Sequence, residues 1–329
     1  MNVVADYYKG DLPWMVDSTI LLVRHGSQAY GTATPESDLD VKGVAIPPRK
    51  YFTGFLNHFE QAESKEPNDL TIYDIRKFIQ LAADCNPNII EVLWADESDY
   101  LYIDWWGKLL VQHRADFLSQ KARHTFSGYA IAQLKRIKTH RRWLLHPPKE
   151  KPQRHHYNLP ETTVIAKDQM GVIQNFEEKG VCDLDAQFGA TVMEAYRRER
   201  SYWNAMTEWG QYLNWKKTRN PKRAELEAKF GYDCKHAMHL VRLMRMCREV
   251  LTSGKVVVRR HDAEELTAIR NGAWDYDFLI QWAEEKDAEL GELVKTTQLP
   301  HHPDRVALDR LCRKVVESHF SIGRDTENS

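Results

Sequence analysis

Residues 19–46 read TILLVRHGSQAYGTATPESDLDVKGVAI, and this stretch determines the fold predicted for the start of the chain. Thr19–Val23 is a short apolar run of strand length, and Leu39–Ile46 is a second run that alternates in its first half. Gly26 and Ser27 follow the first run directly. The stretch therefore predicts two strands, with a turn at the end of the first.

Two acids open the second strand. Asp38 and Asp40 are two residues apart, so their side chains point to the same face if both lie in the strand. Two carboxylates held that close repel each other unless a cation lies between them. Mg²⁺ takes oxygen ligands and commonly bridges carboxylates to substrate phosphates, so this pair predicts a magnesium site.

The turn after the first strand predicts a phosphate site. Gly26 lets the backbone approach a ligand closely, and N–H groups at a turn that enters a helix, here at Ser27, form a concave anion site. We expect Gly31 and Thr32 to extend this cradle. A phosphate-holding turn and a metal-holding acid pair, separated by ten residues, together indicate a nucleotidyl-transfer site.

The pattern after this stretch is first mixed and then helical. Asp69–Ile75 predicts a third strand that runs into a helix at 76–83, and Ile89–Trp94 is a short apolar element that could be a strand or a helix. From about Asp104 the apolar spacing becomes helical, with helices expected at 104–118, 123–145, 187–213, 222–251, 262–270 and 275–297. The predicted fold class is α+β.

Composition limits the class of protein. The 329 residues carry 46 Lys+Arg against 47 Asp+Glu, a net charge of -1 that argues against whole-molecule attraction to nucleic acid. We expect a cytoplasmic protein with no membrane partner, because no apolar run of about eighteen residues and no signal-peptide pattern occur. The cysteines form no CxxC pair, which predicts reduced thiols rather than a zinc cluster: Cys85, Cys182, Cys234, Cys247 and Cys312.

The order Gly-Ser, ten residues, Asp-x-Asp resembles the signature of the DNA polymerase beta nucleotidyltransferase superfamily. One branch, the predicted nucleotidyltransferases associated with RNA ligases, is similar over four segments: GSQAYGTATPESDLDVKGV (26–44), DLTIYDIRKFIQLAADCNPNIIEVLW (69–94), GYDCKHAMHLVRLMRMCREVLTSG (231–254) and ELTAIRNG (265–272). The resemblance implies a small polymerase-beta-like catalytic head at about 1–115 and a mainly helical domain at 116–329. The section at about 147–223 matches no known pattern and is interpreted as an insertion or a divergent helical section.

The resemblance also implies cofactors and substrate. Asp38 and Asp40 would bind two divalent ions, Mg²⁺ or Mn²⁺, and Ser27 with the Gly26 turn would hold the outer phosphates of a nucleoside triphosphate (NTP). His25 departs from the family pattern, because the superfamily usually has an apolar residue before the glycine.

A third carboxylate completes the superfamily site. It lies on a following strand, helps to bind one metal, and orients or deprotonates the attacking hydroxyl. We assign this role to Asp69, at the start of DLTIYDI, and Asp74 and Glu91 are the rival candidates. The alternative for Asp69 is a turn or cap residue after Pro67-Asn68.

Two basic segments could contact phosphate. Lys235, Arg242 and Arg245 fall on one face of an otherwise apolar predicted helix, so Lys235 and Arg242 are expected to bind the nucleotide, with a solvated cationic face as the alternative. The stretch 135–157 (KRIKTHRRWLLHPPKEKPQRHHY) interleaves basic residues with aromatic ones such as Trp143. That composition is typical of RNA contacts, and an exposed helix end and loop is the alternative.

The predicted function is metal-dependent transfer of a nucleoside monophosphate from an NTP to an acceptor hydroxyl, with release of pyrophosphate. The expected acceptor is an RNA end, from a tRNA or a broken RNA under repair. One alternative is AMP transfer to a protein, of a toxin-antitoxin or regulatory type, or to a small molecule. The other is a non-catalytic nucleotide- or RNA-binding protein that retains the fold.

Overall fold

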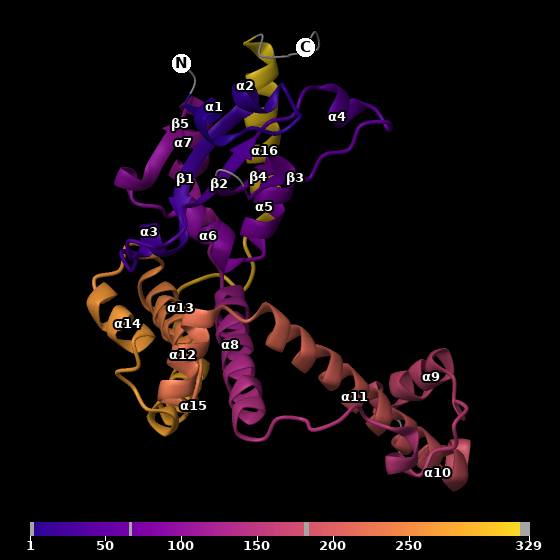
Figure 1. Cartoon of the computed structure of the whole chain (residues 1–329). Coiled ribbons are helices and arrows are strands. Elements are labelled where there is room, and N and C mark those ends of the chain that lie inside the picture. The colour runs from indigo at the N-terminus through magenta and orange to yellow at the C-terminus, as the bar shows by residue number, and fades with distance from the viewer. Residues whose placement is uncertain (1–2, 66–67, 181–183, 323–329) are drawn as a thin grey trace. The chain divides into compact units, whose positions relative to one another are not determined.

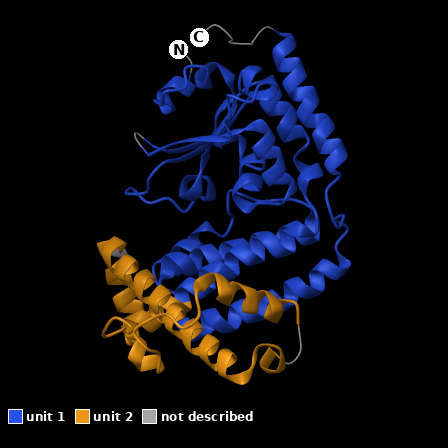
Figure 2. Ribbon diagram, turned by 90° about the vertical axis from the view of Figure 1, so that its right-hand side faces the viewer, with its two compact units in different colours: residues 1–137, 233–329 blue, residues 138–232 orange. Residues whose placement is uncertain are grey.

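The chain forms two compact units, which Figure 2 shows in different colours. The computed structural model describes residues 3–65, 68–180 and 184–322. The first unit combines residues 1–137 with 233–329, and the second consists of residues 138–232. The helices that follow residue 233 therefore belong with the N-terminal sheet, and the section expected at 147–223 lies within the second unit.

One mixed sheet of five strands organises the first unit, in the order β3-β4-β2-β1-β5 (Figure 1). The strands are β1 (Thr19–His25), β2 (Asp40–Ala45), β3 (Gln61–Ser64), β4 (Asp69–Asp74) and β5 (Tyr100–Ile103). β2 and β4 run parallel, and the other described pairs are antiparallel. The three predicted strands are confirmed as β1, β2 and β4. The edge strands β3 and β5 escape prediction because four residues carry too little periodicity.

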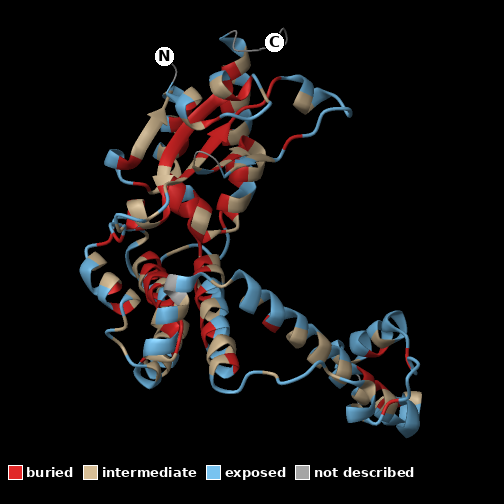
Figure 3. Cartoon of the chain, viewed as in Figure 1, coloured by how far each residue is buried: buried red, intermediate tan, exposed pale blue. Residues whose placement is uncertain are grey.

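The two faces of the sheet differ, because successive side chains of a strand point to opposite sides. One face carries Leu22, Val41 and Leu70, which are buried together with Trp14 and Met15 near the short helices α1 (Val4–Tyr7) and α2 (Met15–Ser18). Buried residues follow the three central strands, as Figure 3 shows. This apolar face anchors the sheet. The opposite face carries both buried apolar residues, such as Leu21 and Val44, and polar residues, such as Asp40.

Short helices connect the strands: α3 (Gly26–Tyr30), α4 (Lys50–Thr53), α5 (Ile75–Ala83) and α6 (Pro87–Leu93), with a 3-10 turn at Glu97–Asp99. After β5 come α7 (Trp105–Gln112) and a 3-10 turn at Arg114–Phe117. Asn86 caps α6, since its side chain accepts a hydrogen bond from the Asn88 N–H, and Pro87 occupies the first turn. The ambiguous element at 89–94 is therefore helical. It is α6 that brings Glu91 next to β1.

The remaining helices of the first unit follow residue 233: α13 (Cys234–Ser253), α14 (Ala263–Arg270), α15 (Tyr276–Thr296) and α16 (Arg305–Ser321). The prediction of one helix over 222–251 is wrong. Gly231 has φ +75°, which ends α12 (Pro221–Phe230), and the Asp233 side chain then caps α13 by accepting from the His236 N–H at 3.0 Å. Sequence periodicity missed this break because both helices are amphipathic.

The second unit is helical. It contains the end of α8 (Lys121–Leu145), a 3-10 turn at Arg154–Tyr157, α9 (Lys167–Glu178), α10 (Leu184–Phe188), α11 (Ala190–Thr218) and α12. A small core holds it together, formed by Ile165, Ile173, Met193 and Tyr196. A mixed sheet followed by a mostly helical body confirms the predicted α+β class.

The sequence predicts reduced cysteines and no membrane-spanning segment. Cys85 and Cys247 are buried free thiols and Cys312 is a half-buried one, whereas Cys182 lies outside the described residues. Among the helices that the structure describes, none combines the length and the apolarity that crossing a membrane requires.

Candidate functional site

Three polar side chains form a row across the ends of the three central strands. His25 on β1 is paired with Asp40 on β2, and Asp40 is paired in turn with Asp69 on β4. Paired residues of neighbouring strands point to the same face and have their Cβ atoms about 5 Å apart. The row lies on the face opposite to the apolar cluster of Leu22 and Val41, and the two carboxylates lie side by side there.

Gly26 lies directly against Asp40. It follows β1, has φ +63°, and a Cβ built on it would overlap Oδ2 of Asp40 and lie 2.9 Å from its Cγ. Only glycine therefore fits at this position, both for its backbone conformation and for the space beside it. The predicted phosphate turn and the predicted metal carboxylate are thus in contact, although they are separated along the chain by the ten residues between Ser27 and Asp38.

Burial and like charge act on Asp40 together. Burial raises the pKa of Asp40 above its ordinary value, and the neighbouring charge of Asp69 adds to this rise, against the opposing effect of nearby cations. A cation between the two carboxylates would relieve their repulsion. A set of carboxylate oxygens fits a hard divalent ion such as Mg²⁺ or Mn²⁺, so Asp40 and Asp69 suit the predicted metal.

Asp38 lies outside the strand. The sequence places Asp38 and Asp40 on one strand face, but β2 begins at Asp40, and Asp38 is an exposed residue of the preceding loop. Strand alternation therefore does not decide where the Asp38 side chain points. It is exposed and precedes Asp40 by two residues.

The two rivals of Asp69 lie elsewhere. Asp74 is at the other end of β4, buried, where its side chain caps α5 by accepting from the Arg76 N–H at 2.6 Å and forms an ion pair with the Arg76 guanidinium. Glu91 is buried in α6 and bound to Arg242. Among these three acids, strand register brings only Asp69 beside Asp40.

Of the remaining residues predicted to bind the nucleotide, Ser27 and Lys235 are accessible, whereas Thr32 and Arg242 are buried. Ser27 is half-buried in the turn, and Lys235 is exposed on α13, near enough to Asp40 for its charge to lower the pKa of that carboxyl. Thr32 is buried and its N–H donates to the Ser27 carbonyl at 3.0 Å, so this N–H closes the turn instead of facing a phosphate. Arg242 is buried against Glu91, which corrects the expectation of an exposed basic face.

Sequence reasoning missed two side chains near the row, Lys42 and Tyr30. Lys42 follows Asp40 by two residues on the same face of β2, and burial lowers the pKa of its ammonium group. Tyr30 ends α3 and donates its hydroxyl to Glu91 at 2.6 Å. Strand alternation could have found Lys42, and the departure of His25 from the family pattern was the signal for a polar partner behind the turn.

Two residues of the predicted RNA stretch at 135–157, Trp143 and Arg154, are engaged in contacts within the second unit. Trp143 is buried among aromatic rings, with Tyr212 and Trp215 at centroid distances of 5.8 and 5.4 Å. It therefore cannot stack on a base. Arg154 forms an ion pair with the buried Glu199 at 2.6 Å, so it too is bound internally.

Comparison with known protein families matches this part of the chain. The model of the RNA repair pathway DNA polymerase beta family matches residues 15–148, which include β1, β2, β4 and the row of polar side chains. The match covers 134 of the 329 residues, so this segment is similar to that family. It supports a polymerase-beta-like, RNA-ligase-associated nucleotidyltransferase, as the resemblance predicts.

A curated relative covers a smaller part. An uncharacterized 38.9 kDa protein of Enterobacteria phage T4, encoded in the nrdC-mobD intergenic region, is 31% identical over 84 residues. The match covers 23% of this chain and 25% of the phage protein, so the chain spans about a quarter of that relative's length. No solved structure gives a significant match.

Proposed function

We propose that the chain transfers a nucleoside monophosphate from an NTP to an acceptor hydroxyl and releases pyrophosphate. The contact between Gly26 and Asp40, with Asp69 beside Asp40 in the sheet, is the observation that supports this reaction most strongly. It joins a turn suited to the outer phosphates to a carboxylate pair suited to divalent ions. A triphosphate held by the turn has its inner phosphate directed toward the acids.

Each residue has a distinct task in this proposal. Asp38, Asp40 and Asp69 would hold two Mg²⁺ or Mn²⁺ ions, which when bound lower the pKa of the attacking hydroxyl and stabilise the leaving pyrophosphate. Asp69 also orients the attacking hydroxyl. Gly26 and Ser27 hold the outer phosphates, and Lys235 adds positive charge on the side of α13.

We propose an RNA end as the acceptor. The family whose model matches residues 15–148 is described as part of an RNA repair pathway, and Lys135 and Arg136 are exposed on α8. The burial of Trp143 removes one stacking residue from the 135–157 stretch, whereas His155 and His156 are exposed. AMP transfer to a protein remains the alternative function. A cytoplasmic location remains a prediction from the sequence.

The deciding experiment incubates the protein with each α-labelled NTP, with Mg²⁺ or Mn²⁺, and with total RNA or tRNA. Asp40→Asn and Asp69→Asn should each abolish metal-dependent incorporation, because each removes a charged ligand. Asp74→Asn is the matched control on the same strand: it should lower the melting temperature but leave the activity of the folded protein intact, since Asp74 caps α5.

Three results would change the proposal. Label in protein instead of RNA would favour the protein-modifying function. Loss of activity in Asp74→Asn with full activity in Asp69→Asn would reverse the assignment of the third carboxylate. Binding of NTP and metal without any transfer, across all acceptors, would favour a non-catalytic nucleotide-binding protein.

A further inference from the structure

A buried cluster of four side chains lies behind the Gly26–Ser27 turn, with Glu91 of α6 at its centre. Oε2 of Glu91 accepts from the Tyr30 hydroxyl at 2.6 Å and lies 3.1 Å from Nε2 of His25. Oε1 of Glu91 forms an ion pair with Arg242 of α13. The side chains of Glu91, His25 and Arg242 are only 0%, 7% and 5% exposed. Both carboxylate oxygens are therefore engaged away from solvent.

The cluster joins the two ends of the turn to one carboxylate. His25 is the last residue of β1, and Tyr30 is the last residue of α3, so Gly26 and Ser27 lie between the two. The guanidinium of Arg242 also stacks on Tyr30, 3.8 Å from the ring centroid. Because His25 and Tyr30 both depend on Glu91, a shift of this carboxylate moves both ends of the turn.

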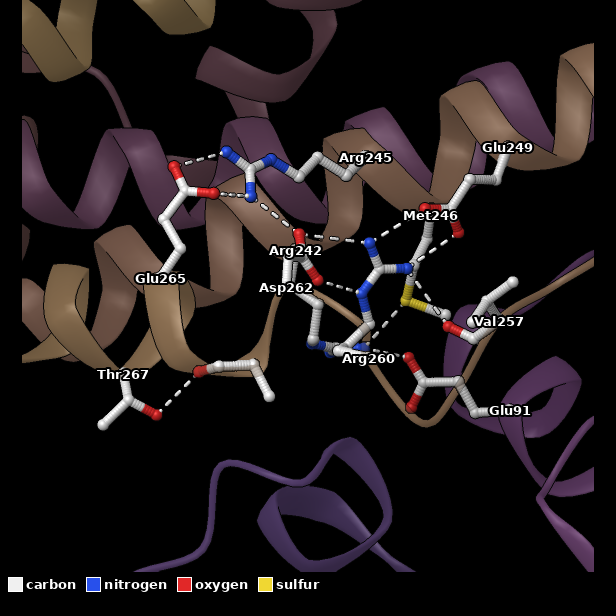
Figure 4. Close-up of polar contacts among 11 residues, drawn as sticks. Glu91, Arg242, Arg245, Met246, Glu249, Val257, Arg260, Asp262, Glu265 and Thr267 are labelled. Atoms are coloured by element: carbon white, nitrogen blue, oxygen red, sulfur yellow. Dashed lines mark hydrogen bonds and ion pairs between the residues drawn. The ribbon is translucent and has the colours of Figure 1, made fainter.

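A second layer holds Tyr30 from the side of the C-terminal helices. The backbone N–H of Arg260 donates to the Tyr30 carbonyl at 3.1 Å. The side chain of Arg260 is fully buried and forms ion pairs with Glu249 and Asp262, as Figure 4 shows. Asp262 also binds Arg245. Helices α13 and α14 are thus connected to the turn through hydrogen bonds and ion pairs.

Glu91 and Arg242 are both charged although both are buried. Burial alone would raise the pKa of Glu91, but the charge of Arg242 and the hydrogen bonds of the cluster hold it below its ordinary value, so the carboxylate is ionised. A buried ion pair is a weak source of stability, because apolar side chains of similar volume are often as stable. The ion pair contributes orientation here, since an ionised carboxylate fixes the position of each hydrogen-bond donor around it.

We propose that Glu91, Tyr30 and Arg242 are positioning residues that hold the Gly26–Ser27 turn against Asp40, and that helix α13 is thereby part of the nucleotide site. The inference rests on the proposed function. Through Gly26 the cluster fixes the position of the Asp40 carboxylate, and through Ser27 it fixes the phosphate contact. Arg242 acts through Glu91 and does not touch the substrate.

Tyr30→Phe is the most selective test, because it removes one hydroxyl and keeps the ring. Losing a hydrogen bond to a carboxylate should loosen the turn and raise KM for NTP about tenfold, with kcat changed by less than about threefold. Tyr8→Phe is the matched control: its hydroxyl accepts from the Leu12 N–H at 3.1 Å, within the apolar cluster on the other face. Tyr8→Phe should leave KM unchanged.

The ion pair is tested by a single and a double substitution. Glu91→Gln leaves Arg242 buried without its ionised partner and should lower the melting temperature. Glu91→Gln/Arg242→Met removes both charges and should recover most of that stability while KM remains raised. Glu199→Gln, at a buried carboxylate paired with Arg154 in the second unit, controls for the loss of any buried ion pair. Recovery of KM together with stability in the double variant would refute a positioning role.

Two further readouts separate this inference from the proposed reaction. Affinity for α,β-methylene-ATP with Mg²⁺, measured by calorimetry, needs no turnover, and hydrogen exchange of residues 26–31 needs no ligand. Tyr30→Phe should weaken the affinity for the ATP analogue and accelerate hydrogen exchange in residues 26–31. If the wild-type protein shows no transfer, the proposed reaction fails while these two measurements still test the positioning. If Tyr30→Phe shows the same exchange rate and the same affinity as Tyr8→Phe, the positioning role is refuted.

Discussion

Replacing Gly26 with alanine would place a methyl group where the Asp40 carboxylate lies. The backbone has φ +63°, a left-handed conformation that costs a residue with a Cβ about 1–2 kcal/mol. The new Cβ would overlap Oδ2 of Asp40 and lie 2.9 Å from its Cγ, so the carboxylate must move by about 1 Å or more to reach ordinary contact distance. Misplacement of that size at a reacting centre costs about 100-fold in rate.

Gly31→Ala separates these two effects. The Gly31 N–H donates to the Gln28 carbonyl at 3.2 Å and so closes the turn, which corrects the expectation that Gly31 extends the phosphate cradle. Gly31 also has a left-handed backbone, with φ +76°, but a Cβ there would meet only the Cβ of Ala263 at 3.6 Å, which is an ordinary contact. Both variants should therefore lose about 1–2 kcal/mol of stability, or about 2–8 °C in melting temperature. Only Gly26→Ala should lose about 100-fold in kcat/KM.

The assay combines thermal unfolding with metal-dependent incorporation of an α-labelled nucleotide at several NTP concentrations. Binding of Mn²⁺ by both variants gives an independent measure of the Asp40 position, and it should weaken in Gly26→Ala alone. Equal activity in the two variants, at equal stability, would show that contact between Gly26 and Asp40 has no bearing on the chemistry. That result would refute the reasoning from which the reaction is proposed.

Two further predictions concern Asp262 and the exposed cations of α8. Burial alone would raise the pKa of Asp262, but hydrogen bonds from Arg260 and Arg245 lower it to about 2. The resulting stability, about 2 kcal/mol, is present above the ordinary pKa near 4 and is lost as pH falls toward 2. Asp262→Asn should thus melt lower than wild type at pH 7, by about half as much at pH 3, and nearly with it at pH 2 or below. A deficit that does not shrink over this range would contradict this origin. Lys135→Glu/Arg136→Glu should reduce the salt dependence of RNA binding by about 1.4 in log–log slope, for two lost phosphate contacts, without changing the melting temperature. An unchanged slope would exclude these cations from the RNA contact.

Much of the site was predictable because its signals are local. The apolar run before Gly26 and the alternation after Asp40 define two strands, and a strand's period of two is a property of the backbone alone. A glycine at position 26 likewise indicates a positive φ, which is a property of that single residue. Local signals become unreliable at element ends, which is why Asp38 was expected in the strand and lies in the loop before it.

Pairing between distant segments decided the rest. The sequence alone left Asp69, Asp74 and Glu91 as candidates for the third carboxylate, because no local pattern specifies which strands become neighbours. Parallel pairing of β2 and β4 set Asp69 beside Asp40 and left Asp74 at the far end, as the cap of α5. Choosing among the three acids required the strand register.

The amino-acid sequence by itself determined the α+β class, the turn at Gly26 and the position of Asp40 at the start of a strand, because each depends on backbone periodicity or on the conformational freedom of one residue. Only the tertiary structure decided that Arg242 serves Glu91, 151 positions earlier in the chain, instead of facing a ligand. Helical periodicity shows which residues share a face of α13, but what that face meets depends on the packing of the whole unit.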